Sequence, residues 1–371
     1  MKIFATRLSF IILCLSFIIY HLSFNTVSAQ TSISHYTPGI TPEGAIYFLP
    51  KTAIRVTVQM EKTTYTPGEF CKYADRYLRL KNVSTEPSVS YRITSVRQEA
   101  VGVADTLKGY AVKFDAKSVA ANIALSNDGV LLAINATPVP TPLQPAFRPA
   151  PRQETANPRQ FMSEEILIAG STAKMAELTA KDIYEIRESR NLLVRGQAEN
   201  MPQDGAQLKL MLTQLDLQDR SLTSLFAGNI QKDTLERVIT FVPGVPDQDS
   251  QEPRQELLFR FSKRLGIVDN DDLAGTPYYI IVEDLHTTPL AEVVEKKKNK
   301  QEPGIYVNVP GKMKSAIFSA DGTISEEELP AAQYGNTELL SGALFNKRYT
   351  THLWLNPVTG AVDRLEAEQP K

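Results

Sequence analysis

A proline-rich segment in the middle of the chain limits where a core can form. Residues 137–158, TPVPTPLQPAFRPAPRQETANP, hold seven prolines and few other apolar side chains. Proline fixes its own φ angle and has no backbone N–H, so such a stretch favours an extended conformation and cannot pack into a core. The segment predicts a boundary at 137–162, as an interdomain linker or a long surface excursion, between modules at 44–136 and 163–371.

The first module, residues 44–136, is predicted to be rich in strands. Apolar and polar residues alternate from Ile54 to Met60, which is the pattern of a half-buried strand. Further strands are expected within 88–116, and Asp128-Gly129 between two apolar runs is a strong hairpin signal. Apolar residues at helical spacing within 70–78 predict one short helix between the first strands.

The second module, residues 163–371, is predicted to open with two amphipathic helices. In the first helix the apolar residues are Ile183, Ile186, Leu193 and Val194. In the second they are Leu208, Met211, Leu212, Leu215, Leu222, Leu225 and Phe226. Glycines end both runs, and the connection between them is short, so an antiparallel helical hairpin is expected over 172–228.

Strands return between residues 235 and 366, with hairpin signals at Asp321-Gly322 and Thr359-Gly360. Such a run favours a mostly antiparallel sheet with the helical hairpin packed on it or beside it. The predicted fold class is therefore α+β, with two modules.

The N-terminus has the pattern of a secretory signal peptide. Lys2 and Arg7 precede an apolar run from Leu8 to Tyr20, and small residues follow at Val27-Ser28-Ala29. We predict removal of residues 1–29 and export to the periplasm or the cell envelope. An uncleaved anchor is the alternative, although the apolar run is short for a membrane span. No later segment has the composition of a transmembrane helix.

Cys71 is the only cysteine that remains after this processing, since Cys14 lies inside the apolar run. An odd thiol in an oxidising compartment suggests pairing between chains, reactivity or burial. Cys71 borders the apolar face of the short helix at 70–78, and a buried free cysteine behaves as a small hydrophobe. We therefore expect it to be a core residue rather than a nucleophile.

Several stretches together resemble an uncharacterised protein family. They are YFLPKT at 47–52, PGEFCKYADRYL at 67–78, IYEIRESRNLLVRG at 183–196 and GIYVNVPGK at 304–312. The chain is similar to the family named domain of unknown function 4831, exported proteins of anaerobic Gram-negative gut bacteria, from about residue 44 to 365. The resemblance implies an exported location and the joint occurrence of both modules. It implies no catalytic residues.

The same group of bacteria attaches glycans to short triplets of the Asp-Thr-Leu type in exported proteins. Asp105-Thr106-Leu107 and Asp233-Thr234-Leu235 are similar to that pattern. A three-residue match also arises by chance. Glycosylation at these triplets is an expectation that the intact mass of the exported protein tests.

Motifs of common enzymes are weak in this chain. Ser171 and Lys174 match the Ser-x-x-Lys arrangement of penicillin-binding enzymes, and Ser189-Arg190-Asn191 mimics the second box, but no Lys-Thr-Gly follows. We expect Ser171 to cap a helix instead. The sequence also contains no Gly-x-Ser-x-Gly, phosphate loop or dinucleotide fingerprint, so no cofactor is predicted.

Metal binding is not predicted either. Residues 317–328 resemble half of a calcium loop but offer Ile317 where an oxygen ligand is required, so a hairpin tip is favoured. Asp269 to Asp272 are interpreted as a turn between strands. The mature histidines, His35, His286 and His352, are too far apart in sequence for a local zinc motif.

The remaining signals concern binding partners. The formal net charge of −2 indicates no concentrated basic surface, so nucleic acid is not expected. Trp354, the single tryptophan, is expected to pack while Leu353 and Leu355 point inward. We predict a non-enzymatic binding or scaffold protein for another exported protein or a polysaccharide. The alternative is a secreted hydrolase acting on glycan or peptide, with scattered acids or Cys71 and a histidine as its catalytic groups, which the sequence does not identify.

Overall fold

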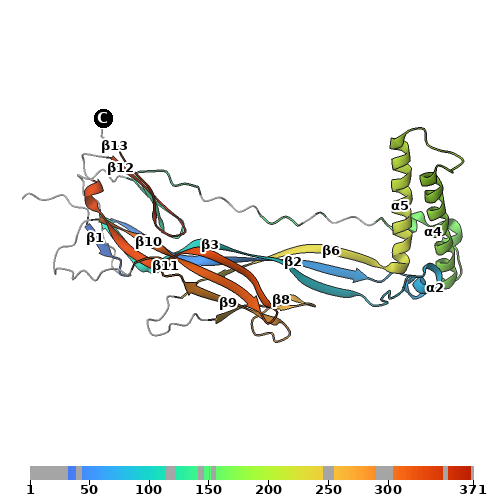
Figure 1. Ribbon diagram of the computed structural model, residues 1–371, viewed down its shortest axis with the longest axis horizontal. Coiled ribbons are helices and arrows are strands. Elements are labelled where there is room, and N and C mark those ends of the chain that lie inside the picture. The colour runs from blue at the N-terminus through green and yellow to red at the C-terminus, as the bar shows by residue number, and fades with distance from the viewer. Residues whose placement is uncertain are drawn as a thin grey trace, which may run out of the picture.

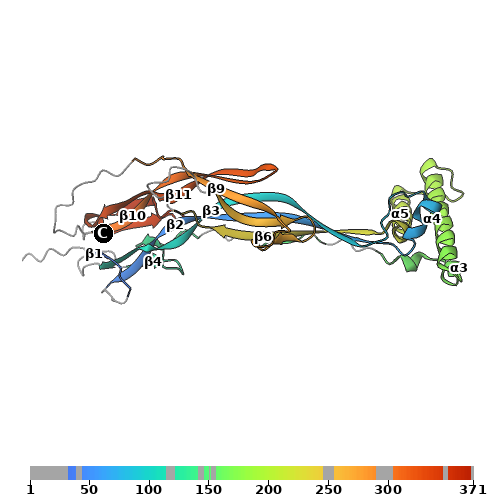
Figure 2. The same cartoon turned by 90° about the horizontal axis from the view of Figure 1, so that it is seen from below.

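The computed structural model describes residues 32–38, 44–113, 122–140, 146–149, 151, 156–244, 255–289, 304–345 and 350–368. These segments form an elongated molecule (Figures 1 and 2), in which a body made of sheets is joined by a ribbon of long strands to a helical head. The α+β class predicted from the sequence is confirmed. The proposed signal peptide at 1–29 lies outside the described residues.

The longest sheet runs from the body to the head. Its order is β1-β3-β2-β6, and all of its pairings are antiparallel. The strands are β1 (Ser32–His35), β2 (Ala45–Thr66), β3 (Ser88–Lys113) and β6 (Asn229–Phe241). At about 3.3 Å per residue, the 22 residues of β2 span roughly 70 Å, which makes this strand the spine of the molecule.

Two further antiparallel sheets complete the body. One has the order β11-β10-β9-β7-β8, and the other has the order β13-β12-β5-β4. The strands of the first are β7 (Gln255–Ser262), β8 (Gly266–Val268), β9 (Thr276–Asp284), β10 (Gly304–Ser319) and β11 (Gly322–Ser341). Those of the second are β4 (Ile123–Leu125), β5 (Leu131–Ile134), β12 (Thr350–Leu355) and β13 (Val362–Glu368), with the short helix η3 (Gly342–Phe345) before β12.

The hairpin predictions are confirmed at all three places. Asp128-Gly129 joins β4 to β5, Asp321-Gly322 joins β10 to β11, and Thr359-Gly360 lies between β12 and β13. Each of these glycines has a positive φ angle, which glycine adopts more readily than any other residue.

The sheets do not follow the predicted division at 137–162. Strand β6 comes after the proline-rich segment, yet it pairs along β2 from Ile54 to Thr66. Strand β12 likewise pairs with β5. The described residues within 137–157 form no helix or strand, as their prolines require. Modules 44–136 and 163–371 therefore share two sheets, because strand pairing joins segments that the sequence separates.

Three clusters of buried side chains lie along the molecule. One, with Tyr47, Leu131 and Leu353, packs the sheets at the end of the body. A second, with Val56 and Phe259, joins the long sheet to the five-stranded sheet. The third fills the base of the helical head. Strand β2 contributes to the first two clusters, and this explains why most of its residues between Tyr47 and Met60 are buried.

The head is a helical hairpin with short helices at its base. The long helices are α4 (Thr172–Arg195) and α5 (Gly205–Ala227), as the sequence predicted. The short ones are η1 (Cys71–Tyr73), α2 (Ala74–Leu78), η2 (Pro158–Phe161) and α3 (Glu164–Leu167). Asp204 caps the N-terminus of α5 by accepting a hydrogen bond from the Gln207 backbone N–H at 2.7 Å.

A close backbone approach connects the short helices to the end of α5. The backbone N–H of Phe70 donates to the Leu225 carbonyl at 2.7 Å. A Cβ atom at Gly68 would lie 2.2 Å from that same carbonyl oxygen, so only glycine fits there. The Pro67-Gly68 turn thus sets η1 and α2 against the base of the hairpin.

Candidate interaction surface on the helical hairpin

Ser171 is a helix cap, as predicted. Its Oγ accepts a hydrogen bond from the backbone N–H of Lys174 at 3.2 Å, which satisfies one of the free donors at the start of α4. The ammonium group of Lys174 instead pairs with Glu177 at 2.9 Å, and this contact raises the pKa of Lys174 above its ordinary value. The Lys174 ammonium group is thus engaged with Glu177 rather than with the Ser171 hydroxyl.

The acidic segment 269–272 is a turn, also as predicted. Oδ1 of Asp272 accepts from the Ala274 backbone N–H at 2.8 Å, and Arg260 donates to the backbone carbonyls of Asn270 and Gly275. These contacts close the connection between β8 and β9. Within the described segments, no three His, Cys, Asp or Glu side chains converge as metal ligands.

The thiol and the imidazoles considered from the sequence lie in different parts of the molecule. Cys71 belongs to the helical head, whereas His352 is on β12 at the opposite end (Figure 1). His286 follows β9 and contacts Asp284 at 3.3 Å. The prediction of a buried thiol was wrong, because Cys71 is only half-buried at the edge of the head.

Trp354 packs as the sequence suggested, with Leu353 and Leu355 buried on the other face of β12. The indole N–H donates to the Thr137 carbonyl at 3.1 Å, and the guanidinium of Arg364 lies 4.9 Å from the ring centroid. Arg364 therefore occupies a face of the ring that a sugar would need.

The two Asp-Thr-Leu triplets differ in presentation. Residues 105–108 form a bulge of β3, since the pairing with β2 jumps from Ala104 to Gly109, and Leu107 is 90% exposed there. The triplet at 233–235 lies in a regularly paired part of β6. The first triplet is the more accessible of the two.

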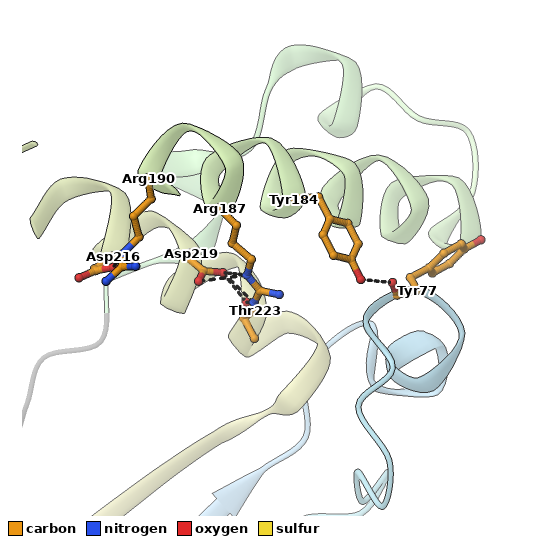
Figure 3. A network of polar contacts seen from close by, with 7 residues as sticks. All are labelled: Tyr77, Tyr184, Arg187, Arg190, Asp216, Asp219 and Thr223. Carbon is orange, nitrogen blue, oxygen red and sulfur yellow. Dashed lines mark hydrogen bonds and ion pairs between the residues drawn. The ribbon is translucent and has the colours of Figure 1, made fainter. Parts of the chain in front are cut away.

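One face of the hairpin is fastened by polar contacts (Figure 3). The guanidinium of Arg187 donates to both carboxylate oxygens of Asp219, at 3.0 and 3.2 Å, and to Thr223 Oγ1 at 3.1 Å. Nearer the tip, Arg190 Nε donates to Asp216 at 2.7 Å. We call this the latched face. Both ion pairs connect α4 to α5 and hold the two helices in a fixed register.

The hairpin presents a different surface on the side of Ser189 and Leu192. Because successive residues of a helix are 100° apart, Leu192 lies about 160° around α4 from Arg190 on the latched face. Here an open groove of about 660 Å³ runs between the outer halves of the two helices. Its apolar lining comprises Leu192, Leu193, Ala198, Leu210, Met211 and Leu215. The polar residues that line it are Ser189, Glu199, Asn200 and Gln214.

The exposure of this groove follows from what covers the hairpin. At the base, η1, η2, α2 and α3 contact the two long helices and bury Ile183, Leu222 and Phe226 completely. In the outer half, residues 187–220, Leu193 is the only buried side chain. Two helices alone cannot enclose an apolar core, so the outer half leaves apolar surface in contact with water.

Sequence patterns identified part of this surface. Met211 and Leu215 belong to the predicted apolar stripe of the second helix, but Leu210, which also lines the groove, lies outside it. Leu210 is 61% exposed. A leucine on the otherwise polar side of an amphipathic helix was the available signal for a second apolar face.

The fold and this groove define a class, namely an elongated α+β protein with an open apolar groove on a terminal helical hairpin. The chain belongs to the family described as Domain of unknown function (DUF4831), whose model matches residues 43–363. No curated protein and no solved structure matches the chain. The helices in the described segments are too short or too polar to serve as membrane spans.

Proposed function

We propose that this protein is a non-enzymatic binding or scaffold protein of the cell envelope that holds another exported protein with the outer half of its helical hairpin. The observation that carries the proposal is the open apolar groove between α4 and α5. A groove with an apolar floor and a few polar groups at its edge is the form of a protein-binding site.

The shape of the molecule supports this role. The head is separated from the body by the ribbon of β2, β3 and β6 (Figure 1), so the groove lies at one end of a long scaffold. A protein partner fits the groove better than a polysaccharide does, because sugar sites use aromatic platforms and the groove is lined by leucine and methionine.

A site-specific cross-link tests the proposal. A photo-reactive phenylalanine analogue is placed at Leu210 and, in a control, at Leu273, which is a more exposed leucine on the body. After irradiation of cells that make the full chain, we expect one discrete adduct with another protein from position 210 and none from position 273. Adducts at both positions, or at neither, would contradict a specific site on the hairpin.

Export is part of the same proposal. The secretory pattern of residues 1–29 supports it, and the product is then expected to begin at Gln30. N-terminal sequencing of the protein from the envelope fraction checks this directly. The intact mass of that product also reports on the Asp-Thr-Leu triplets, since a mass equal to the bare chain would show that neither carries a glycan.

A further inference from the structure

We infer that the free edge of β6 is a dimer interface, at which a second copy of this chain adds its own β6 in antiparallel orientation. This surface is separate from the groove, and the inference goes beyond the proposed function. Three observations support it. The edge is open and regular, its backbone groups point outward, and its side chains are complementary to those of an identical strand.

Strand β6 is an open and regular edge strand. It lies at the border of the sheet β1-β3-β2-β6, and among the described strands only β2 pairs with it. That pairing runs from Asn229 to Phe241 without a shift of register, and the strand contains no proline. Exposed edges that stay unpaired in natural proteins are usually short, bulged or interrupted by proline or clustered charge.

The other edge strands of the described sheets carry such protection. Strands β1, β4 and β8 have four, three and three residues. Strand β11 is long, but it contains Pro330, three successive glutamates at 326–328 and two shifts of register with β10. Strand β13 has seven residues and one shift of register with β12. Strand β6 therefore stands out as a long edge that is ready to pair.

The direction of the backbone groups of β6 follows from a contact of β3. The N–H of Tyr91 donates to the Lys263 carbonyl at 2.8 Å, so it points away from β2. Tyr91 opposes Lys62, whose N–H and C=O therefore point toward β6, where Lys62 opposes Asp233. Because this direction alternates along a strand, the even-numbered residues within 230–240 direct their backbone groups to the free edge.

The side chains of these even-numbered residues are self-complementary around Thr234. When Thr234 opposes its own copy, Ile230 opposes Val238 of the second copy, and Lys232 opposes its Glu236. Ile230 and Val238 are 62% and 50% exposed. Cross-strand apolar pairs and opposite charges both stabilise a sheet. A two-fold axis repeats each pair, and the strands would share about ten backbone hydrogen bonds.

Both charged residues can reach a second partner. Lys232 contacts Glu61 at 3.3 Å, but its side chain is 59% exposed and an ammonium group has three donors. Glu236 accepts a hydrogen bond from Gln59 at 3.1 Å through one oxygen, and a carboxylate has further acceptor positions. The pairs across the interface would therefore add to the contacts within each copy.

A pairing slipped by one residue fits less well. A two-fold axis at Leu235 would bring Asp233 opposite Arg237, but it would leave Ile230 and Val238 without apolar partners. In the pairing about Thr234, Leu235 opposes Asp233, and this mismatch is smaller because Leu235 is only 38% exposed. The side chains with the most apolar surface in water thus select the axis at Thr234.

The antiparallel pairing also determines the form of the dimer. Strand β6 runs from the helical head into the body (Figure 1), so the heads of the two copies would lie at opposite ends. Each end would then carry one groove between α4 and α5.

Single-cysteine variants in a Cys71→Ser background test the pairing. In Thr234→Cys the new thiol lies opposite its own copy, with the Cα atoms about 5.5 Å apart, which suits a disulfide. After mild oxidation we expect a covalent dimer from Thr234→Cys and none from Thr240→Cys, which changes an exposed threonine of the same strand face. Covalent dimers from both variants, or from Leu235→Cys in preference, would overturn the pairing about Thr234.

Sedimentation equilibrium of the purified full chain measures the affinity of the dimer. Val238→Lys should raise its dissociation constant roughly tenfold or more, whereas Val242→Lys, at an exposed valine beyond the strand, should leave it unchanged. Lys232→Glu should weaken the dimer by a similar factor, and adding Glu236→Lys should restore it, because the exchanged charges attract again. Circular dichroism of each variant checks that the chain remains folded.

The remaining outcomes decide between this inference and its alternatives. A chain that stays monomeric up to about 100 µM overturns the inference. A disulfide from Thr234→Cys to a different protein in cells, without a dimer of this chain, would show that a strand of another protein occupies the edge. The cross-link from position 210 does not depend on β6, so the proposed function and this inference can fail separately.

Discussion

The base and the outer half of the helical hairpin are made from the same two helices, but they differ in what surrounds them. At the base, Ile183 and Phe226 are completely buried beneath the short helices. In the outer half, Leu210 is 61% exposed although it belongs to the same helix as Phe226. The comparison shows that an apolar residue on an amphipathic helix becomes core only where a third element covers it.

The largest expected difference concerns the core itself. Phe226→Ala removes a buried ring that packs 5.4 Å from the ring of Phe70, and we expect a loss of about 3–5 kcal/mol in the free energy of unfolding. Leu210→Ala should change it by less than about 0.5 kcal/mol, because the side chain is mostly in water. Chemical denaturation followed by circular dichroism measures both. Equal losses would refute the contrast between base and outer half.

The contact between the short helices and α5 should give the next largest effect. Gly68→Ala places a Cβ atom against the Leu225 carbonyl, and we expect it to cost about 1–3 kcal/mol. Gly170→Ala is the matched control, since nothing lies within 4 Å of a Cβ atom there. The melting temperatures of the two variants are compared by thermal unfolding. An unchanged melting temperature for Gly68→Ala would show that the turn can shift to accommodate the added Cβ atom at no cost in stability.

The N-caps of the two long helices test the same comparison, because one lies at the base of the hairpin and the other at its tip. Ser171 caps α4 at the base of the hairpin and Asp204 caps α5 at its tip. Each change to alanine should cost the helix about 1 kcal/mol. Ser171→Ala should lower global stability, whereas Asp204→Ala should mainly increase amide hydrogen exchange in the first turn of α5. If Asp204→Ala by itself lowered the global free energy of unfolding, the tip of the hairpin would unfold together with the base and not separately.

The smallest expected effects concern the latched face. Asp219→Asn removes an ion pair of Arg187 whose side chains are 39% and 25% exposed, so solvent screening limits the loss to about 1 kcal/mol. Asp216→Asn, nearer the tip, should cost less because Arg190 makes a single contact there. Urea denaturation at low and high salt measures both. A larger loss in the free energy of unfolding for Asp216→Asn would show that the Arg190–Asp216 pair stabilises the hairpin more than the Arg187–Asp219 pair.

Local sequence patterns predicted the elements of this fold well where one physical signal dominated. Helices α4 and α5, the short helix after Gly68 and the three Gly-containing hairpins all lie where spacing and turn residues placed them. The cap at Ser171 and the turn at 269–272 were also predicted, because side-chain hydrogen bonds to nearby backbone depend on few residues.

Predictions of burial were less accurate. Val194 shares the predicted apolar face of α4 with Ile183, but it is 61% exposed near the tip, and Cys71 is half-buried. Periodicity indicates which face of a helix is apolar, but it does not indicate how far a neighbouring element extends along that face. The candidate site depends on this second quantity, so sequence patterns identified its leucines without identifying the groove.

The sequence alone determined the type of most elements and the limits of the two long helices, because helix spacing, strand alternation, caps and glycine turns act over a few residues. Only the tertiary structure decided that β6 pairs with β2 across the proline-rich segment and that the outer half of the hairpin is uncovered. Both are contacts between segments far apart in the chain, and their free energy depends on three-dimensional geometry that no local pattern encodes.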